Sequence, residues 1–262
     1  MKTFLTLLLT LTIAASFAQD NSPYIKKLFV RGADTLPYRV LYPLNHNPKK
    51  KYPLVLFLHG AGERGTNNES QLIHGASLFA DSANRKRFPA IVIFPQCPYT
   101  DYWARMKLVK EMTDSTPHQI EYPADGPPNK SLDMVSQLID VLAASGSVDS
   151  RRIYVGGLSM GGMGTFELLW RKPRFFAAAF PICGGGNVNR AADYGKNFPI
   201  WVFHGEADQV VDVNDSRKMV KALKEAGAKL KYSEYPKVKH DSWTNTFAEP
   251  GLLPWLFSQK RK

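Results

Sequence analysis

The sequence predicts an α/β fold in which eight strands form a mostly parallel sheet with helices on both faces. Five of the apolar runs are nearly continuous, as expected for parallel strands that are buried on both sides. Helical patterns lie between these runs, and such alternation implies a parallel sheet with right-handed crossovers. The predicted strands are Lys27–Arg31, Tyr38–Tyr42, Leu54–His59, Ala90–Pro95, Arg152–Gly156, Ala177–Ile182, Ile200–His204 and Leu230–Tyr235.

The first two predicted strands are joined only by a short turn near Asp34-Thr35, so we expect them to form an antiparallel edge. Apolar positions at helical spacing between Met134 and Leu142 predict a helix that ends at Gly146. A charged segment with a narrow apolar stripe predicts a second helix, which ends at Gly227.

A chain of 262 residues with 44% hydrophobic and 22% charged residues is long enough for one large domain with a sizeable core. Residues 1–18 stand apart from that core: Lys2 precedes the apolar stretch Phe4–Ala15, and Ser16-Phe17-Ala18 is typical of a cleavage site. We expect a signal peptide at 1–18, a single domain at 19–262, and export to the periplasm or the medium. The apolar stretch is short for a membrane span, so no stable membrane anchor is expected.

The formal net charge of +11 raises the question of an anionic partner. The basic clusters Lys49–Lys51, Arg85–Arg87 and Lys260–Lys262 are spread along the chain and lack interleaved aromatic residues. We interpret them as solvated faces and expect no nucleic-acid partner. Nothing in the sequence predicts an oligomeric state.

The two cysteines, Cys97 and Cys183, each follow a different predicted strand. The predicted topology places two other strands between them, a separation of roughly 14 Å at the usual strand spacing. A disulfide cannot bridge that distance, so we expect two buried free thiols.

One long segment, 96–130, is rich in proline and polar residues and interrupts the regular pattern. It carries the aromatic residues Tyr99, Tyr102 and Trp103. Long loops in compact domains usually serve a function, and we favour a wall that faces substrate over a plain insertion.

The most informative motif is Gly157-Leu158-Ser159-Met160-Gly161, which follows the predicted strand that begins at Arg152. A serine on a tight strand-to-helix turn is exposed at the end of the strand, and the flanking glycines tolerate a strained backbone. The start of the following helix offers unpaired N–H groups and a partial positive charge. The motif predicts Ser159 as a nucleophile, although glycine-rich turns also occur without chemistry.

A serine nucleophile needs a base, and the base needs an orienting acid. Among six histidines, His240 lies in the loop after the eighth strand, from which it can reach Ser159. Asp208 follows the seventh strand by a few residues and is preferred over Asp212 as the acid. His59 and His204 end strands directly before a glycine, and we interpret both as structural. The other competing carboxylates are Asp215, expected at the start of the next helix, and Glu206, too close to the strand end.

The negatively charged oxygen of a tetrahedral intermediate needs two N–H donors. The amide of Met160 directly follows the nucleophile, and the glycine-rich loop His59–Gly65 allows a close backbone approach. We expect Met160 and Ala61 to form the oxyanion hole, with Gly60 as the alternative to Ala61.

Together these residues resemble the α/β-hydrolase superfamily across the mature chain, since Ser159, Asp208 and His240 follow its nucleophile–acid–base order. More narrowly, the chain resembles secreted carboxylesterases, dienelactone-hydrolase-like proteins and the polyhydroxybutyrate depolymerase/feruloyl esterase group. Dienelactone hydrolases proper use a cysteine where this chain has Ser159. The matching segments are His59–Gly65, Pro95–Pro98 with Trp103, Gly157–Gly162, Pro181–Gly186, His204–Asp208 and His240–Trp243.

The resemblance implies a secreted serine esterase that cleaves carboxylic esters, including acetyl or feruloyl esters on carbohydrate, without a metal or organic cofactor. Its substrate is expected to be a small-molecule or polysaccharide-linked ester, contacted by Tyr99, Trp103 and Trp243. Core packing is an equal alternative for the two tryptophans, and Arg64 is expected to hold the oxyanion loop through an ion pair rather than bind substrate. The other functions considered are a prolyl-oligopeptidase-like peptidase and a non-catalytic carbohydrate-binding derivative.

Overall fold

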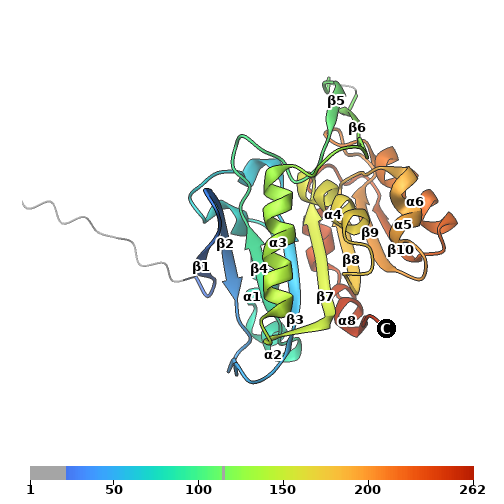
Figure 1. Cartoon of the computed structure of the whole chain (residues 1–262). Helices are drawn as coiled ribbons and strands as arrows, with labels where there is room; N and C mark the ends of the chain where they lie inside the picture. Colours follow the sequence, from blue (N-terminus) through green and yellow to red (C-terminus); the bar gives the residue numbers. More distant parts are fainter. Residues whose placement is uncertain (1–21, 114–115) are drawn as a thin grey trace, which may run out of the picture.

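The computed structural model describes residues 22–113 and 116–262, so the predicted signal peptide lies outside the described residues. An eight-stranded sheet runs through the molecule in the order β1-β2-β4-β3-β7-β8-β9-β10 (Figure 1). The prediction of eight strands is confirmed, with boundaries shifted by a few residues. The strands are β1 (Ile25–Arg31), β2 (Asp34–Leu41), β3 (Tyr52–Leu58), β4 (Ile91–Pro95), β7 (Val148–Leu158), β8 (Ala178–Ile182), β9 (Pro199–Gly205) and β10 (Lys229–Tyr235).

The six strands from β4 to β10 in this order pair in parallel, whereas β1 pairs with β2, and β2 with β4, in the antiparallel sense. The antiparallel edge is as expected, but its turn lies at Gly32-Ala33. Asp34 already pairs with Arg31. Gly32 has φ of 58°, a conformation that glycine adopts without the steric cost of a Cβ, and this sets the turn two residues earlier.

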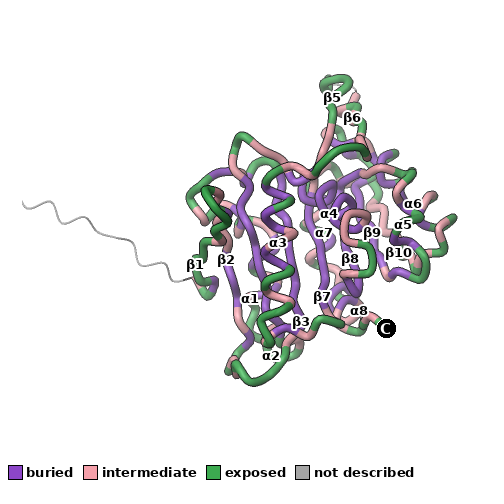
Figure 2. Tube along the Cα trace, in the orientation of Figure 1, coloured by how far each residue is buried: buried purple, intermediate pink, exposed green. Residues whose placement is uncertain are grey.

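Alternate residues of the central strands enter two separate cores. Leu54 and Leu56 of β3 belong to one apolar cluster, and Val55 and Phe57 belong to the other. The helices follow the same division, and Figure 2 shows buried residues concentrated along the central strands. Residues from α3 (Lys130–Ala144), α4 (Met160–Arg171), α5 (Ala191–Tyr194) and α6 (Val213–Glu225) cover the first face; those from α1 (Ala76–Ala80), α7 (Trp243–Ala248) and α8 (Leu252–Ser258) cover the second.

The two helices expected from apolar stripes are α3 and α6. In α3 the stripe residues Val135, Leu138 and Ile139 are buried, and the chain leaves the helix through Gly146 at φ 80°. The short helix α2 (Ser82–Arg87) and the five-residue α1 have no such stripe in the sequence. Among the described residues, no helix is both long and apolar enough to span a bilayer.

The segment 96–130 is not the irregular loop that the sequence predicted. It contains a two-stranded hairpin of β5 (Lys107–Lys110) and β6 (Gln119–Glu121), which projects beyond the strand ends in Figure 1. The hairpin is tied to the loop after β9 just before β6 begins, because the His118 amide donates to the Val210 carbonyl at 3.1 Å. Exposed residues on most hairpin positions gave no strand-like apolar run to detect.

Cys97 and Cys183 are both buried and free, as expected. They follow β4 and β8, and the sheet order places β3 and β7 between those strands.

Candidate active site

Ser159 occupies a strained turn between β7, which ends at Leu158, and α4, which begins at Met160. Its backbone angles are φ 54° and ψ −119°, a region that non-glycine residues rarely adopt. The Ser159 amide donates to the Ile182 carbonyl of β8 at 2.9 Å, which holds the turn against the neighbouring strand end.

The flanking glycines are required because backbone segments pass very close to one another at this turn. A Cβ at position 161 would lie 2.0 Å from the Leu58 carbonyl oxygen at the end of β3. A Cβ at position 157 would lie 2.4 Å from the Gly161 carbonyl oxygen. The motif therefore allows α4 to start directly against the ends of β3 and β7.

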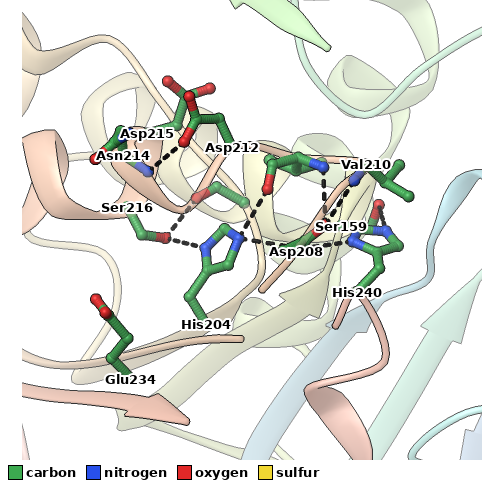
Figure 3. A network of polar contacts seen from close by, with 12 residues as sticks. Ser159, His204, Asp208, Val210, Asp212, Asn214, Asp215, Ser216, Glu234 and His240 are labelled. Atoms are coloured by element: carbon green, nitrogen blue, oxygen red, sulfur yellow. Dashed lines mark hydrogen bonds and ion pairs between the residues drawn. The ribbon is translucent and has the colours of Figure 1, made fainter. Parts of the chain in front are cut away.

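A chain of hydrogen bonds connects the side chains of Ser159, His240 and Asp208 (Figure 3). The Ser159 Oγ lies 3.0 Å from His240 Nε2, and His240 Nδ1 lies 2.7 Å from Asp208 Oδ2. An ionised carboxylate only accepts hydrogen bonds, so His240 carries its proton on Nδ1 and offers the Nε2 lone pair to the serine hydroxyl. The structure thus brings together the three residues that the sequence predicts to act together.

The Asp208 carboxylate is fully buried and accepts four hydrogen bonds. Oδ1 accepts from the amides of Val210 at 2.8 Å and Val211 at 3.0 Å, and Oδ2 faces the imidazoles of His240 and His204. Burial by itself raises the pKa of Asp208. The hydrogen bonds from the two histidines and the Val210 amide outweigh it and hold the pKa well below its ordinary value.

The competing carboxylates have other roles. Asp212 caps α6, where its side chain accepts from the Asn214 amide at 2.8 Å. Asp215 lies in the first turn of α6 and accepts from the Tyr122 hydroxyl at 3.1 Å.

The loops that carry Asp208 and His240 are hydrogen-bonded to each other. The Ala207 amide donates to the Val238 carbonyl at 2.9 Å, and the Lys237 amide donates to Glu206 Oε2 at 3.0 Å. Glu206 therefore contributes to the site by joining the two loops. These bonds fix the acid and the base relative to one another.

The loop after β3 forms a short 3-10 helix, η1 (Ala61–Glu63), whose first amide faces no acceptor within the helix. Met160 holds the same position in α4. The Gly60 amide, in contrast, already donates to the Glu63 carboxylate at 2.9 Å. This bond favours Ala61 over Gly60, the two donors considered in this loop.

Arg64 holds this loop, but through carbonyl groups and a ring rather than through the expected ion pair. Its Nε donates to the Ala61 carbonyl at 3.0 Å and its Nη1 donates to the Tyr99 carbonyl at 3.1 Å. The guanidinium carbon lies 4.4 Å from the centre of the Tyr102 ring. These contacts tie the oxyanion loop to the start of the segment 96–130.

For Trp103 the structure favours core packing, one of the two alternatives that the sequence left equal. The side chain is 0% exposed, and its indole N–H donates to the His59 carbonyl at 3.1 Å. Trp243 lies beside the triad, with its ring centre 5.4 Å from that of His240, and Tyr99 is 70% exposed. A buried aromatic residue and a pocket aromatic residue have the same signature in sequence, so the sequence alone could not decide between these two roles.

The two histidines at strand ends differ from each other. His59 is buried, which lowers its pKa to about 4. It accepts from the Cys97 amide at 3.0 Å through Nε2, and Nδ1 lies 2.6 Å from the Gly60 carbonyl oxygen, so it is structural as expected. His204 bonds the Val211 carbonyl but also the side chain of Asp208, a contact that sequence reasoning missed. The four-residue spacing between His204 and Asp208 was the only signal available.

Among the described residues, one group of side chains has metal-ligand spacing: Cys183, Asp208 and His240, with ligand atoms within 4.8 Å of one another. Burial raises the pKa of the Cys183 thiol well above its ordinary value, so the thiol stays neutral. Asp208 and His240 are already hydrogen-bonded to each other. The donor set therefore suits the hydrogen-bonded chain better than a metal ion.

The fold and this site define an α/β hydrolase. The chain belongs to the phospholipase/carboxylesterase family, whose model matches residues 44–249.

Comparisons with individual proteins agree with this family. A bifunctional acetylxylan esterase/xylanase from Neocallimastix patriciarum is 32% identical over 109 residues, which are 38% of this chain and 16% of that protein. The crystal structure of a thermostable esterase superposes with a TM-score of 0.80 at 39% identity, covering 91% of this chain and 64% of its own. The chain thus spans less than two thirds of either protein.

A feruloyl esterase module from Clostridium thermocellum, solved with sinapinate, superposes with a TM-score of 0.62 at 15% identity. It covers 89% of this chain and 87% of its own, and at this identity the likeness shows the fold alone. The family and the esterase neighbours support a carboxylic ester hydrolase.

Proposed function

We propose that this chain is an exported serine esterase in which Ser159, His240 and Asp208 form the catalytic triad. The observation that carries the proposal is the continuous hydrogen-bonded chain from Ser159 Oγ through His240 to Asp208, at a serine held on a strained strand-to-helix turn. Strain of this kind persists where the surroundings fix it, and it is concentrated at functional sites.

The proposed reaction begins when Ser159 Oγ attacks the ester carbonyl carbon and His240 Nε2 takes the hydroxyl proton. Asp208 stabilises the resulting imidazolium and keeps Nδ1 protonated. The tetrahedral intermediate collapses, the carbon–oxygen bond to the alcohol breaks, and the alcohol leaves with the proton from Nε2. Water then attacks the acyl-enzyme with His240 as base, which releases the acid and restores Ser159.

The oxyanion formed in each half of the reaction is proposed to accept hydrogen bonds from the amides of Met160 and Ala61. Both amides begin a helix, and the positive end of the α4 dipole supports the same charge. Removal of one such donor typically costs about 3 kcal/mol of transition-state stabilisation.

The substrate class proposed is acetyl or feruloyl esters, including those linked to polysaccharide. It is supported by the names of the acetylxylan esterase/xylanase relative and the feruloyl esterase neighbour. Trp243 is proposed to contact the acyl or alcohol group because its ring packs beside that of His240, and Tyr99 because it is exposed near the loop His59–Gly65.

The test is a comparison of the purified full-length chain with its Ser159→Ala variant on p-nitrophenyl acetate, methyl ferulate and acetylated xylan, beside peptide anilides. Hydrolysis of an ester that is lost in the variant supports the proposal. Cleavage of anilides without esters would favour the peptidase, and no turnover together with no labelling of Ser159 by a fluorophosphonate would favour the carbohydrate-binding derivative.

Export rests on the composition of residues 1–18. We expect the protein recovered from the periplasm or medium of an expressing bacterium to begin near Gln19, and N-terminal sequencing checks this. Intact Met1 on protein retained in the cytoplasm would reject export.

A further inference from the structure

A second imidazole contacts the acid of the triad. His204, the penultimate residue of β9, is 0% exposed, and its Nε2 lies 3.1 Å from Asp208 Oδ2 and 3.1 Å from the Val211 carbonyl oxygen (Figure 3). Its other nitrogen, Nδ1, lies 2.7 Å from Ser216 Oγ, which in turn lies 2.8 Å from the Gly184 carbonyl oxygen. The hydrogen-bonded chain of the site thus continues past Asp208 into the core.

The position of one proton on His204 follows from its partners. Nε2 faces two oxygen atoms that can only accept hydrogen bonds, so Nε2 must carry a proton. At Nδ1 the serine hydroxyl can donate to the ring, or it can donate to Gly184 and accept from the ring. In both arrangements His204 keeps the proton on Nε2, and this N–H points at Asp208.

Asp208 Oδ2 consequently accepts from two imidazoles at once, His240 at 2.7 Å and His204 at 3.1 Å. The orientation of the carboxylate does not depend on His204, because Oδ1 is held by the amides of Val210 and Val211. What His204 changes is the negative charge that Oδ2 presents to His240. A carboxylate oxygen with an added donor attracts an imidazolium less strongly.

We propose that His204 is a positioning residue that acts through Asp208: its Nε2–H shares Oδ2 with His240, and this sets the pH at which His240 becomes available as a base. The inference rests on the proposed function and deepens it.

The other ionisable groups around His204 do not replace this contact. Glu234 is its partner on β10, but it is paired with Arg217, whose Nε lies 3.0 Å from Glu234 Oε2. Cys183, after β8, is held neutral by burial. Of the nearby carboxylates, Asp212 accepts from the Asn214 amide, Asp215 from the Tyr122 hydroxyl and Glu206 from the Lys237 amide.

The chain offers a matched pair of variants. The amide nitrogen of glutamine falls near the Nε2 position of histidine, and that of asparagine falls near Nδ1. His204→Gln therefore retains the donor to Asp208, whereas His204→Asn retains only the contact with Ser216. Both are measured in the full-length chain by the pH dependence of kcat/KM on the preferred ester, with thermal melting as a check on folding.

In His204→Asn we expect the midpoint of the acid limb to rise by about half a pH unit or more, with KM nearly unchanged, because His240 then faces the full charge of Oδ2. In His204→Gln we expect the midpoint to return toward that of the wild type. Identical midpoints in all three proteins, with only the melting temperature altered, would overturn the inference and leave His204 structural.

A second measurement needs neither turnover nor folded variants of His204. In the wild-type chain labelled with ¹⁵N-histidine, we expect NMR to show a protonated Nε2 on His204 throughout the range from neutral to mildly acidic pH. His240→Gln removes the signals of the other imidazole that contacts Asp208 and so separates them from those of His204. An unprotonated Nε2 overturns the inference, whereas a protonated Nε2 in a chain that hydrolyses no ester would reject the proposed function alone.

Discussion

Replacement of Asp208 by asparagine tests how the acid controls the proton of His240. Asp208 is the acceptor in all four of its hydrogen bonds: two backbone amides donate to Oδ1, and two imidazoles donate to Oδ2. An asparagine side chain has one oxygen that accepts and one NH₂ group that donates, so it can replace only one of the two carboxylate oxygens. If its oxygen retains the amides of Val210 and Val211, its NH₂ group faces His240 and His204.

An NH₂ group at this position can only donate, so His240 must move its proton from Nδ1 to Nε2. That proton then points at Ser159 Oγ, which lies 3.0 Å from Nε2, and the imidazole can no longer accept the hydroxyl proton. Loss of the correct tautomer in such a triad lowers kcat by about 10⁴-fold, equivalent to about 5 kcal/mol. We expect Asp208→Asn to approach this loss while the chain remains folded.

The assay is kcat at pH 7 to 8 on the ester preferred by the wild type, and Asp212→Asn is the matched control. Asp212 caps α6 by accepting from the Asn214 amide, a function that asparagine performs equally well. We expect the control to keep kcat within about twofold and stability within about 0.5 kcal/mol. If Asp208→Asn retained a tenth of kcat or more, or if the two variants lost equal activity, the reasoning about the acid would be refuted.

Three further outcomes are expected. Gly161→Ala should destabilise the chain by about 3 kcal/mol or more, because its Cβ would lie 2.0 Å from the Leu58 carbonyl oxygen. Gly62→Ala should not, because no atom lies within 4 Å of the Cβ position. Urea unfolding of the two variants compares their stabilities. Because the pKa of Asp208 is depressed, its contribution to stability is complete above the unfolded-state value of about 3.9 and is lost as pH falls toward the folded-state pKa. The melting temperature should therefore fall less steeply below about pH 4 in Asp208→Asn than in the wild type. Trp243→Ala should change the ratio of methyl ferulate to p-nitrophenyl acetate hydrolysis several-fold, and an unchanged ratio would place Trp243 outside the pocket.

The central strands of the sheet were predictable because they are buried on both faces and therefore form short, nearly continuous apolar runs. Residues such as Val55 and Phe57 enter one core and their neighbours enter the other, so the whole run is apolar. The β5–β6 hairpin was not predictable by this signal, because its residues Lys107–Lys110 are all exposed. For Trp103 the sequence could not decide between core packing and contact with substrate, because it shows the type of a side chain and not its burial.

The positions of Ser159, Asp208 and His240 could be predicted because parallel strands end at the same edge of a sheet. The preference for Ala61 over Gly60 as an oxyanion donor, in contrast, depends on the carboxylate of Glu63, which accepts from the Gly60 amide. The role of His204 depends on a backbone turn that brings Asp208 back over the end of β9. Neither contact has a sequence pattern that distinguishes it from an ordinary loop.

The hydrogen bonds between the loops after β9 and β10 hold Asp208 and His240 in a fixed position relative to each other. A Cβ at Gly205 would lie 2.2 Å from the Lys239 carbonyl oxygen, so the backbone before Asp208 runs directly beside the backbone before His240. Asp208 and His240 are thereby held together by a few neighbouring residues. His240 and Ser159, in contrast, follow β10 and β7, and β8 and β9 lie between those strands. A mutation in these loops should move Asp208 and His240 together, and its effect should appear mainly in the 3.0 Å contact between His240 and Ser159. The distance between His240 Nε2 and Ser159 Oγ, across which the proton moves in the proposed attack, is therefore the distance most sensitive to change.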